Sequence, residues 1–235
     1  MTATRRSADE LDSWGLSAAG TVLRVVLWSI KSDHELARAS SGPDVGLVEY
    51  GAISVALRDQ PVCGDAWTCA HGIDCFTVML ADGLGHGLLA HSAAVAAIGS
   101  LVPNNGAALP NLVSDAHHAL RPTVGAALGV VRLPPPDGLS APGRLGGGCD
   151  PRGAGSPRHR IARFCGIGNV AASVWEPGRH HHLVAHAGVV GRSIRETQEF
   201  HATWSRDALL VMHSDGLNTR WELSLYPVCP CAIRP

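Results

Sequence analysis

The alternation of apolar and polar positions along the chain predicts a series of strands interrupted by two helices. Residues 53–57 alternate like a half-buried strand, and residues 76–81 form an apolar run with the length and β-rich composition of a buried one. Apolar and small residues from Leu88 onward predict a helix of about four turns that ends near Pro103. The pattern also predicts a second helix over residues 109–120 and further strands over residues 124–133, 161–165, 170–175, 183–185 and 208–213.

Three stretches depart from this rhythm and suggest how the chain is divided. Residues 1–47 form a heterogeneous leader that holds one strand-like run, residues 21–28, without a domain around it. Residues 134–159 are rich in Pro and Gly, which neither pair in a sheet nor pack in a core, so they predict a flexible insertion between two strands. The interpretation is one domain over residues 48–225, followed by an aberrant tail over residues 226–235.

Composition narrows the class of protein. A chain of 235 residues with 46% hydrophobic and 17% charged residues can bury a core, and it is neither disordered throughout nor a multi-span membrane protein. The formal net charge of -1 gives no global attraction to nucleic acid or to a membrane, so we expect neither as a partner. Seven cysteines without CxxC spacing imply no disulfide framework and favour a cytoplasmic location.

Candidate chemistry lies where apolar strands end. Asp82 and Asp215 each follow such a strand and precede a glycine, and Asp65 follows Gly64 in a third segment. An Asp-Gly pair taken alone is first of all a turn signal. Carboxylates brought together at strand ends repel one another unless a hard divalent cation such as Mg²⁺ or Mn²⁺ neutralises them. The pattern therefore predicts a divalent cation site.

Three segments carry a family resemblance. They are Asp82-Gly83-Leu84-Gly85-His86-Gly87 with the small-residue helix behind it, Gly166-Ile167-Gly168-Asn169, and Leu209-Leu210-Val211-Met212-His213-Ser214-Asp215-Gly216-Leu217. In this order they resemble the PPM-type (protein phosphatase 2C-like) phosphatases, and more narrowly the bacterial SpoIIE/RsbX branch, over nearly all of residues 48–221. The resemblance implies an α+β fold, a four-layer αββα sandwich of two antiparallel sheets flanked by helices.

The resemblance also implies an activity and roles for single residues. The chain would be a serine/threonine protein phosphatase with two Mn²⁺ or Mg²⁺ ions, in which water attacks phosphorus without a covalent enzyme intermediate. Asp82 would bridge both ions, the Gly83 carbonyl and Asp65 would bind one, and Asp215 would hold the other. The substrate would be a phosphorylated STAS-domain anti-sigma-factor antagonist or a stressosome protein of a bacterial stress-signalling pathway.

The chain departs from the branch at its end. Members normally close with a strand that carries a further Asp, whereas residues 226–235 contain no Asp or Glu and hold prolines that oppose a central strand. The sandwich would then lack its last strand and the second cation site would be incomplete. The alternative is therefore a catalytically impaired phosphatase-like remnant that binds a regulatory partner without turnover.

Two further interpretations stay open, one for the N-terminal leader and one for His86. Residues 20–28 faintly resemble the last strand of a GHKL-type ATP-binding domain, so the leader would be a remnant of one, although a simple surface strand fits as well. His86 lies in the predicted cation loop and would donate a proton to the leaving serine. In the family the better-known histidine directly follows the Asp-Gly pair, where this chain has Leu84.

Several polar residues have a functional and an ordinary interpretation. Asn169 is expected to be a turn residue rather than a ligand. Arginines at positions 121, 192 and 206 would contact a phosphoprotein or simply be solvated. A third class of function, a binding module for a soft metal, would use His180, His181, His182 and His186 or Cys229 and Cys231, although a solvated hairpin end is the favoured interpretation of the histidines and an ordinary interpretation is likewise favoured for the cysteines.

Overall fold

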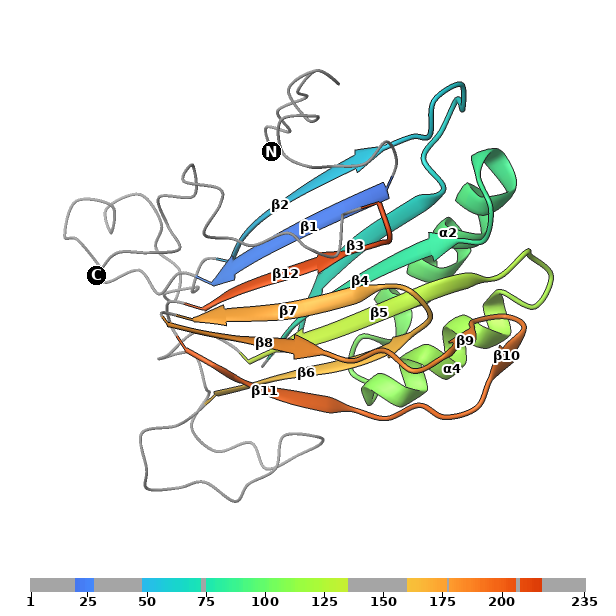
Figure 1. Cartoon of the computed structure of the whole chain (residues 1–235). Coiled ribbons are helices and arrows are strands. Elements are labelled where there is room, and N and C mark those ends of the chain that lie inside the picture. Colours follow the sequence, from blue (N-terminus) through green and yellow to red (C-terminus); the bar gives the residue numbers. More distant parts are fainter. Residues whose placement is uncertain are drawn as a thin grey trace, which may run out of the picture.

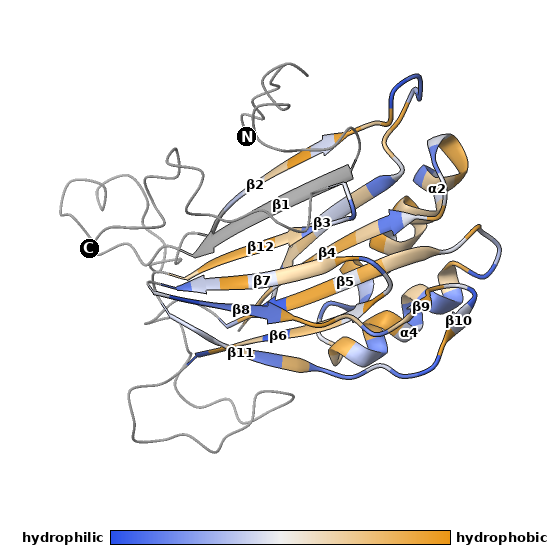
Figure 2. Cartoon of the chain, viewed as in Figure 1, coloured by the Kyte–Doolittle hydropathy of each residue, from blue (hydrophilic) through white to orange (hydrophobic). Residues whose placement is uncertain are grey.

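Two antiparallel β-sheets stacked face to face, with helices outside one of them, make up the fold (Figure 1). The computed structural model describes residues 20–27, 48–72, 75–134, 160–176, 178–205 and 208–216. The prediction of an α+β fold with two antiparallel sheets is confirmed. The middles of the central strands are hydrophobic, whereas β8 and the connecting loops are hydrophilic (Figure 2).

The first sheet has the strand order β2-β1-β12-β7-β8. Every neighbouring pair in it is antiparallel. Its strands are β1 (Gly20–Leu27), β2 (Val48–Val55), β7 (Ala171–Glu176), β8 (Arg179–Leu183) and β12 (Leu209–His213).

The second sheet has the order β11-β6-β5-β4-β3 and is also antiparallel throughout. A short hairpin of β9 and β10 lies beside it. The strands are β3 (Asp65–His71), β4 (Phe76–Gly83), β5 (Ala126–Leu133), β6 (Arg160–Ile167), β9 (Gly188–Val189), β10 (Ser193–Ile194) and β11 (Phe200–Trp204). The helices are α2 (Gly87–Gly99), α3 (Leu101–Asn104) and α4 (Leu109–Ala119).

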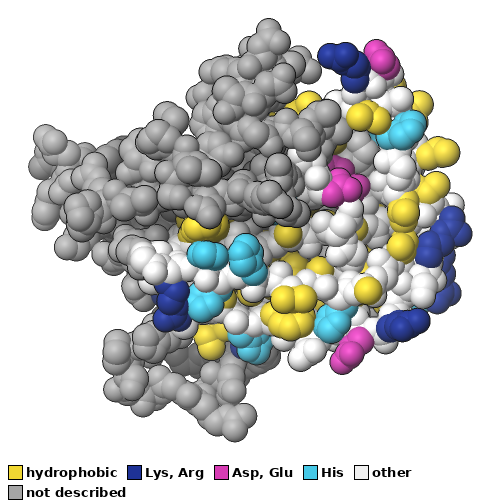
Figure 3. Space-filling view, viewed as in Figure 1, with side chains coloured by type: hydrophobic (Ala, Val, Ile, Leu, Met, Phe, Trp, Pro, Cys, Tyr) yellow, Lys and Arg dark blue, Asp and Glu magenta, His cyan; other side chains and the backbone are white. Residues whose placement is uncertain are grey.

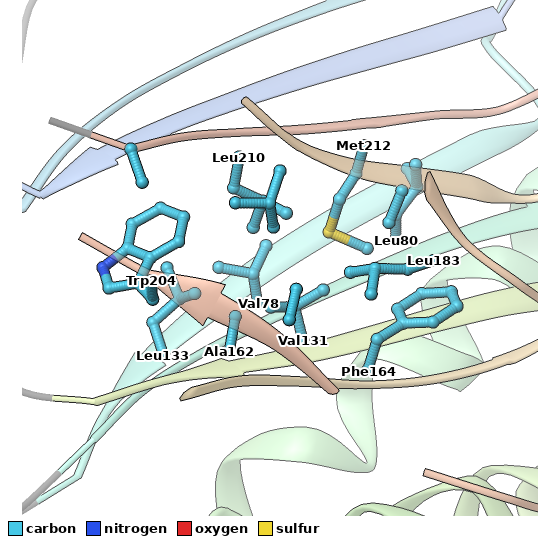
Figure 4. Close-up of a cluster of buried hydrophobic side chains, with 14 of the residues drawn as sticks. Val78, Leu80, Val131, Leu133, Ala162, Phe164, Leu183, Trp204, Leu210 and Met212 are labelled. Atoms are coloured by element: carbon cyan, nitrogen blue, oxygen red, sulfur yellow. The ribbon is translucent and has the colours of Figure 1, made fainter. Parts of the chain in front are cut away.

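One apolar core fills the space between the two sheets (Figure 4). Val78 and Leu80 of β4 face Leu210 and Met212 of β12, and all four side chains are fully buried. Each such side chain contributes about 1.5–3 kcal/mol relative to an exposed one. This packing holds the strands of both sheets firmly, so the residues at their ends have fixed positions.

A second core lies between the second sheet and the helices. The alternate residues of β4, Met79 and Ala81, point to this side and pack with Ala94 and Ala97 of α2. Because β4 is buried on both faces, its sequence is a continuous apolar run. The described helices all serve this sheet, and no helix among the described residues covers the outer face of the other one.

Helix α2 is apolar almost all round. The stretch Gly87–Asn104 is long and apolar enough to cross a membrane by length and composition alone, but only a third of it is buried inside the protein. It comprises α2 and α3, which pack on β3 and β4 as part of the domain. We therefore describe it as a domain helix whose outer face happens to carry exposed leucines.

The strand in the predicted leader belongs to the domain. β1 pairs along its whole length with β2 and also pairs with β12, so it is an inner strand of the first sheet. The boundary that the sequence analysis drew after residue 47 therefore falls between two strands of one sheet. Its relation to an ATP-binding domain stays a hypothesis, because nothing in the sheet pairing bears on ancestry.

Most predicted elements occur, with local differences. The second helix, the buried strand over residues 76–81 and the strand over residues 208–213 are confirmed as α4, β4 and β12. The strand predicted over residues 183–185 is wrong in position, because β8 ends at Leu183 and includes the three preceding histidines. The hairpin β9–β10 and strand β11 were not predicted.

Other predictions fall outside the described residues. Nearly all of the insertion predicted over residues 134–159, the tail over residues 226–235 and its two cysteines, and Arg206 all lie there. The end of the predicted domain after Gly216 lies there as well. The described residues do not test the proposed loss of the last strand, and the described helices make up one helical layer of the expected four-layer sandwich.

Candidate metal centre

Strands β3 and β4 place two carboxylates side by side. Asp65 begins β3 and Asp82 lies near the end of β4, and the register of the two strands pairs them directly across the ladder. Asp65 is buried and Asp82 is half-buried. Like charges directly opposite each other destabilise a sheet, so this pairing needs a compensating partner.

The end of β12 brings the other sheet to the same place. Ser214 follows β12 directly, is fully buried, and donates its hydroxyl proton to Asp65 Oδ2 at 2.7 Å. Asp215 comes next in the chain and is exposed. The Ser214 hydrogen bond therefore joins Asp65, in the second sheet, to the residue that follows β12 of the first sheet.

Asn169 connects the remaining carboxylates. It lies in the turn between β6 and β7, and its Nδ2 donates to Asp215 Oδ2 at 2.9 Å. The Asn169 side chain also acts on Asp82, where it lowers the pKa of the carboxyl and so opposes the effects that raise it. Asn169 was expected to be a turn residue only, and the structure adds contacts with two of the three candidate ligands.

The electrostatics show that the three carboxylates act on one another. Burial and the negative charges of Asp65 and Asp215 raise the pKa of Asp82 to about 7. An ordinary exposed Asp is fully ionised far below that pH. A proton held by Asp82 relieves the repulsion in this arrangement.

This donor set fits a hard divalent cation. Oxygen atoms of carboxylates are the ligands that Mg²⁺ and Mn²⁺ prefer, and a cation would replace the proton that now relieves the repulsion. In the described part of the chain, no group of three or more His, Cys, Asp or Glu side chains is arranged so that it could hold a metal ion. Asp65 and Asp215 are instead held by the neutral donors of Ser214 and Asn169.

The backbone around the carboxylates is held by helix α2. His91 of α2 is hydrogen-bonded through Nδ1 to the Cys63 carbonyl at 2.9 Å, which anchors the segment before Asp65. The Gly83 amide donates to the Gly64 carbonyl at 3.2 Å. Gly83 lies so close to the backbone of Ala90 that a Cβ atom there would stand 2.7 Å from the Ala90 Cα atom. Only glycine allows this approach of strand and helix.

Replacing Gly83 by alanine is expected to be strongly destabilising. The new methyl group would meet the backbone of α2, which cannot move without disturbing the second core, so we expect a loss of about 3 kcal/mol or more. Gly99→Ala is the matched control, because nothing lies within 4 Å of a Cβ there and the change within a helix should stabilise by about 1 kcal/mol. Urea unfolding of both variants measures the difference, and equal stabilities would contradict the close approach.

His86 lies at the edge of this group. It is the N-cap residue of α2 and is exposed, and its imidazole makes no hydrogen bond to a described residue. The structure therefore puts it in the loop that follows Asp82 without bringing it into contact with the carboxylates. Its part as a proton donor stays a proposal.

Three of the other predicted histidines, at positions 180–182, lie on β8, away from the carboxylates, whereas His186 lies after it and packs on Phe200. His180 stacks on Trp175, with ring centroids 4.6 Å apart, and the ring of His182 lies edge-on to that of His180. His181 accepts a hydrogen bond from Arg179 at 2.7 Å. These contacts give the described histidines ordinary strand partners, and none joins two others in a cage of metal ligands among the described residues.

Two residues of the centre were not assigned roles from the sequence. Asn169 and Ser214 touch the carboxylates across 46 and 149 positions of the chain, respectively. A usable signal did exist for Asn169, since it follows a Gly-Ile-Gly turn at the end of a predicted strand, as the aspartates follow theirs. Ser214 gave no such signal apart from its position beside Asp215.

Solved structures share this arrangement of sheets and helices. A chain solved in work on the bacterial stressosome as a modular system that controls secondary messenger signalling has a TM-score of 0.59 at 20% identity, over 86% of this chain and 82% of that one. RsbX in complex with magnesium has a TM-score of 0.56 at 18% identity, over 70% and 72%. The chain has the fold of the PPM-type phosphatases.

A third similar structure is that of SpoIIE, described as a cell fate determinant. The structure of the PP2C phosphatase domain of SpoIIE from Bacillus subtilis, with a fragment of its regulatory domain, has a TM-score of 0.50 at 14% identity. The match covers 81% of this chain and 54% of that one. No family model and no curated protein matches the sequence. The PPM-type fold is therefore established by structure, and the activity is argued below from the residues.

Proposed function

We propose that this chain is a cation-dependent protein phosphatase that hydrolyses phosphoserine or phosphothreonine. The observation that carries the proposal is the meeting of Asp65, Asp82 and Asp215 from both sheets, with the pKa of Asp82 raised to about 7 by its neighbours. Carboxylates with strongly perturbed pKa values gather at functional sites, so the mutual effect of these three favours a functional role. The PPM-type fold supports the same reaction class.

The candidate ligands divide between the two sheets. Asp82 would bridge two Mn²⁺ or Mg²⁺ ions, Asp65 and the Gly83 carbonyl would hold one of them, and Asp215 would hold the other. Such a pair of ions supplies an activated water and neutralises charge on the phosphoryl oxygens. Ser214 and Asn169 orient the carboxylates of Asp65 and Asp215 by their hydrogen bonds. His86, exposed beside the centre, would give a proton to the leaving serine oxygen.

The substrate class is proposed from the similar structures. One of them was solved in work on the bacterial stressosome and another is RsbX. We therefore infer that the substrate is a phosphorylated STAS-domain or stressosome protein in the cytoplasm of a bacterium. The exposed position of Asp215 and His86 agrees with a large substrate, because a phosphoserine on a protein surface must reach the carboxylates from solvent.

The decisive experiment compares turnover with binding. The full chain, stripped of cations by a chelator, should hydrolyse neither p-nitrophenyl phosphate nor a phosphoserine peptide, and added Mn²⁺ should restore both reactions. Failure to restore either reaction, with undisturbed binding of the phosphopeptide, would leave the impaired remnant as the better description. A chain that hydrolyses these esters equally well without a divalent cation would contradict the proposal.

A further inference from the structure

A cluster of arginines lies next to the candidate metal centre. Arg121 follows α4, and Arg192 and Arg195 lie on either side of β10; all three side chains are exposed. Figure 3 shows Arg side chains gathered at the end of the molecule where β9, β10 and α4 lie in Figure 1. Within the described ranges, no carboxylate forms an ion pair with any of these guanidinium groups.

Arg192 is held in place by the backbone rather than by an acid. Its Nη2 donates to the Thr123 carbonyl at 2.7 Å, and its Nε donates to the Val124 carbonyl at 3.3 Å. Its aliphatic stem lies over Gly125, where a Cβ atom would stand 3.2 Å from the Arg192 Cγ atom. The guanidinium is therefore oriented in advance, with its positive charge unneutralised and its other N–H groups turned to no described residue.

The segment that holds Arg192 is hydrogen-bonded to the loop after Asp82. The Gly125 carbonyl accepts a hydrogen bond from the Leu84 amide at 3.0 Å. Ala126 pairs with Gly83 across the β4–β5 ladder and exchanges two hydrogen bonds with Val190, at 3.0 and 2.8 Å. Thr123 and Val124, whose carbonyls hold Arg192, come two to three residues before Ala126, the residue opposite Gly83. Three residues of extended chain span about 10 Å.

The hairpin that carries Arg192 is fastened to α4. The Gly191 amide donates to His117 Nδ1 at 3.0 Å, and Gly191 lies so close to Leu120 that any side chain there would meet its backbone. Arg121 directly follows Leu120, so it and Arg192 flank a single packed contact. The backbone that carries Arg121 and Arg192 is consequently fixed at this contact.

We propose that Arg192, together with Arg121 and Arg195, binds an acidic segment of the protein substrate. The preferred substrates would then carry Asp or Glu within a few residues of the phosphoserine, since an extended peptide covers about 10 Å in three residues. The parallel N–H groups of an arginine guanidinium can donate to both oxygens of a carboxylate. Positive charges beside a site also attract a negatively charged partner and set its orientation. The inference rests on the proposed function and names the substrate class of that same site.

The test uses two phosphoserine peptides that differ only in their flanks, Asp and Glu in one and Asn and Gln in the other. We expect the wild-type chain to bind the acidic peptide more tightly in fluorescence anisotropy, and added salt to reduce that preference. Arg121→Glu and Arg195→Glu remove no hydrogen bond to a described residue, so they change charge without loosening the hairpin. Each of these variants, and Arg192→Glu, should reduce the preference about five- to tenfold.

The matched control is Arg179→Glu, an exposed arginine on β8 that contacts His181 and Thr203. It should keep the wild-type preference. An unchanged preference in all three cluster variants would overturn the inference, even if p-nitrophenyl phosphate is hydrolysed. A lost preference without any hydrolysis would support the inference and remove the proposed function. Equal competition by a single-stranded DNA of the same charge would assign the cluster to nucleic acid and also overturn it.

Discussion

Asp82→Asn should abolish cation-dependent hydrolysis and, at the same time, make the cation-free protein more stable. The charges of both Asp65 and Asp215 act on Asp82. Its replacement should therefore abolish cation binding at the candidate centre rather than only reduce the affinity for one cation. We expect hydrolysis of p-nitrophenyl phosphate to fall about a thousandfold, which corresponds to about 4 kcal/mol of barrier. The two opposite effects on activity and stability distinguish a functional carboxylate from one that only supports the fold.

The gain in stability has a simple electrostatic origin. An amide cannot repel Asp65 and Asp215 and costs less to bury than a carboxylate, so at pH 8 the free energy of unfolding should rise by about 1 kcal/mol or more. Urea unfolding in the presence of a chelator measures it, and calorimetric titration with Mn²⁺ should show the lost affinity. Asp115→Asn on α4 is the control, and a similar loss of Mn²⁺ affinity there would count against the centre.

The strongly patterned elements could be predicted because each is defined locally. β4 is apolar at nearly every position since it is buried between the other sheet and the helices, and α4 has a buried face at helical spacing. The end of β4 at Asp82-Gly83 follows from the same pattern. The positions of Asp65, Asp82 and Asp215 at strand ends were therefore readable from the sequence, together with the cation chemistry they suggest.

The contacts that complete the centre could not be predicted, because they join distant parts of the chain. Nothing local to Ser214 indicates that its hydroxyl reaches Asp65. The turn before Asn169 marks the end of a strand, but it does not indicate that the Asn169 amide donates to Asp215. β1 shows the same limit on a larger scale. Its composition identifies a strand, but the place of that strand between β2 and β12 depends on pairing partners elsewhere in the sequence.

β8 was misplaced for a different reason. Its residues Arg179–Leu183 are mostly polar because the strand lies at the edge of the first sheet, with several side chains exposed. Three successive histidines do not show the apolar alternation that marks a half-buried strand. Here the pairing with β7 outweighs the weak local preference, as Trp175 and His180 stack across the ladder.

The raised pKa of Asp82 makes stability and cation binding depend on pH in a defined way. In the unfolded chain this carboxyl loses its proton near pH 4, and in the folded, cation-free chain near pH 7. Between these values the folded state holds more protons than the unfolded state, so stability falls as pH rises. The contribution of Asp82 is fully present below about pH 4 and is lost by the time the pH has passed about 7.

Cation binding should show the reverse dependence. A cation must displace the proton from Asp82, so affinity for Mn²⁺ should rise with pH up to about 7 and then level off. Calorimetry in two buffers of different ionisation enthalpy counts the protons released, and we expect close to one per binding event at pH 6 and almost none at pH 8. Unfolding of the cation-free wild type and of Asp82→Asn should diverge across the same interval, with the wild type becoming the less stable of the two. Parallel stability curves from pH 4 to pH 8 would show that the carboxylates do not act on one another, and the case for a shared cation would fail with them.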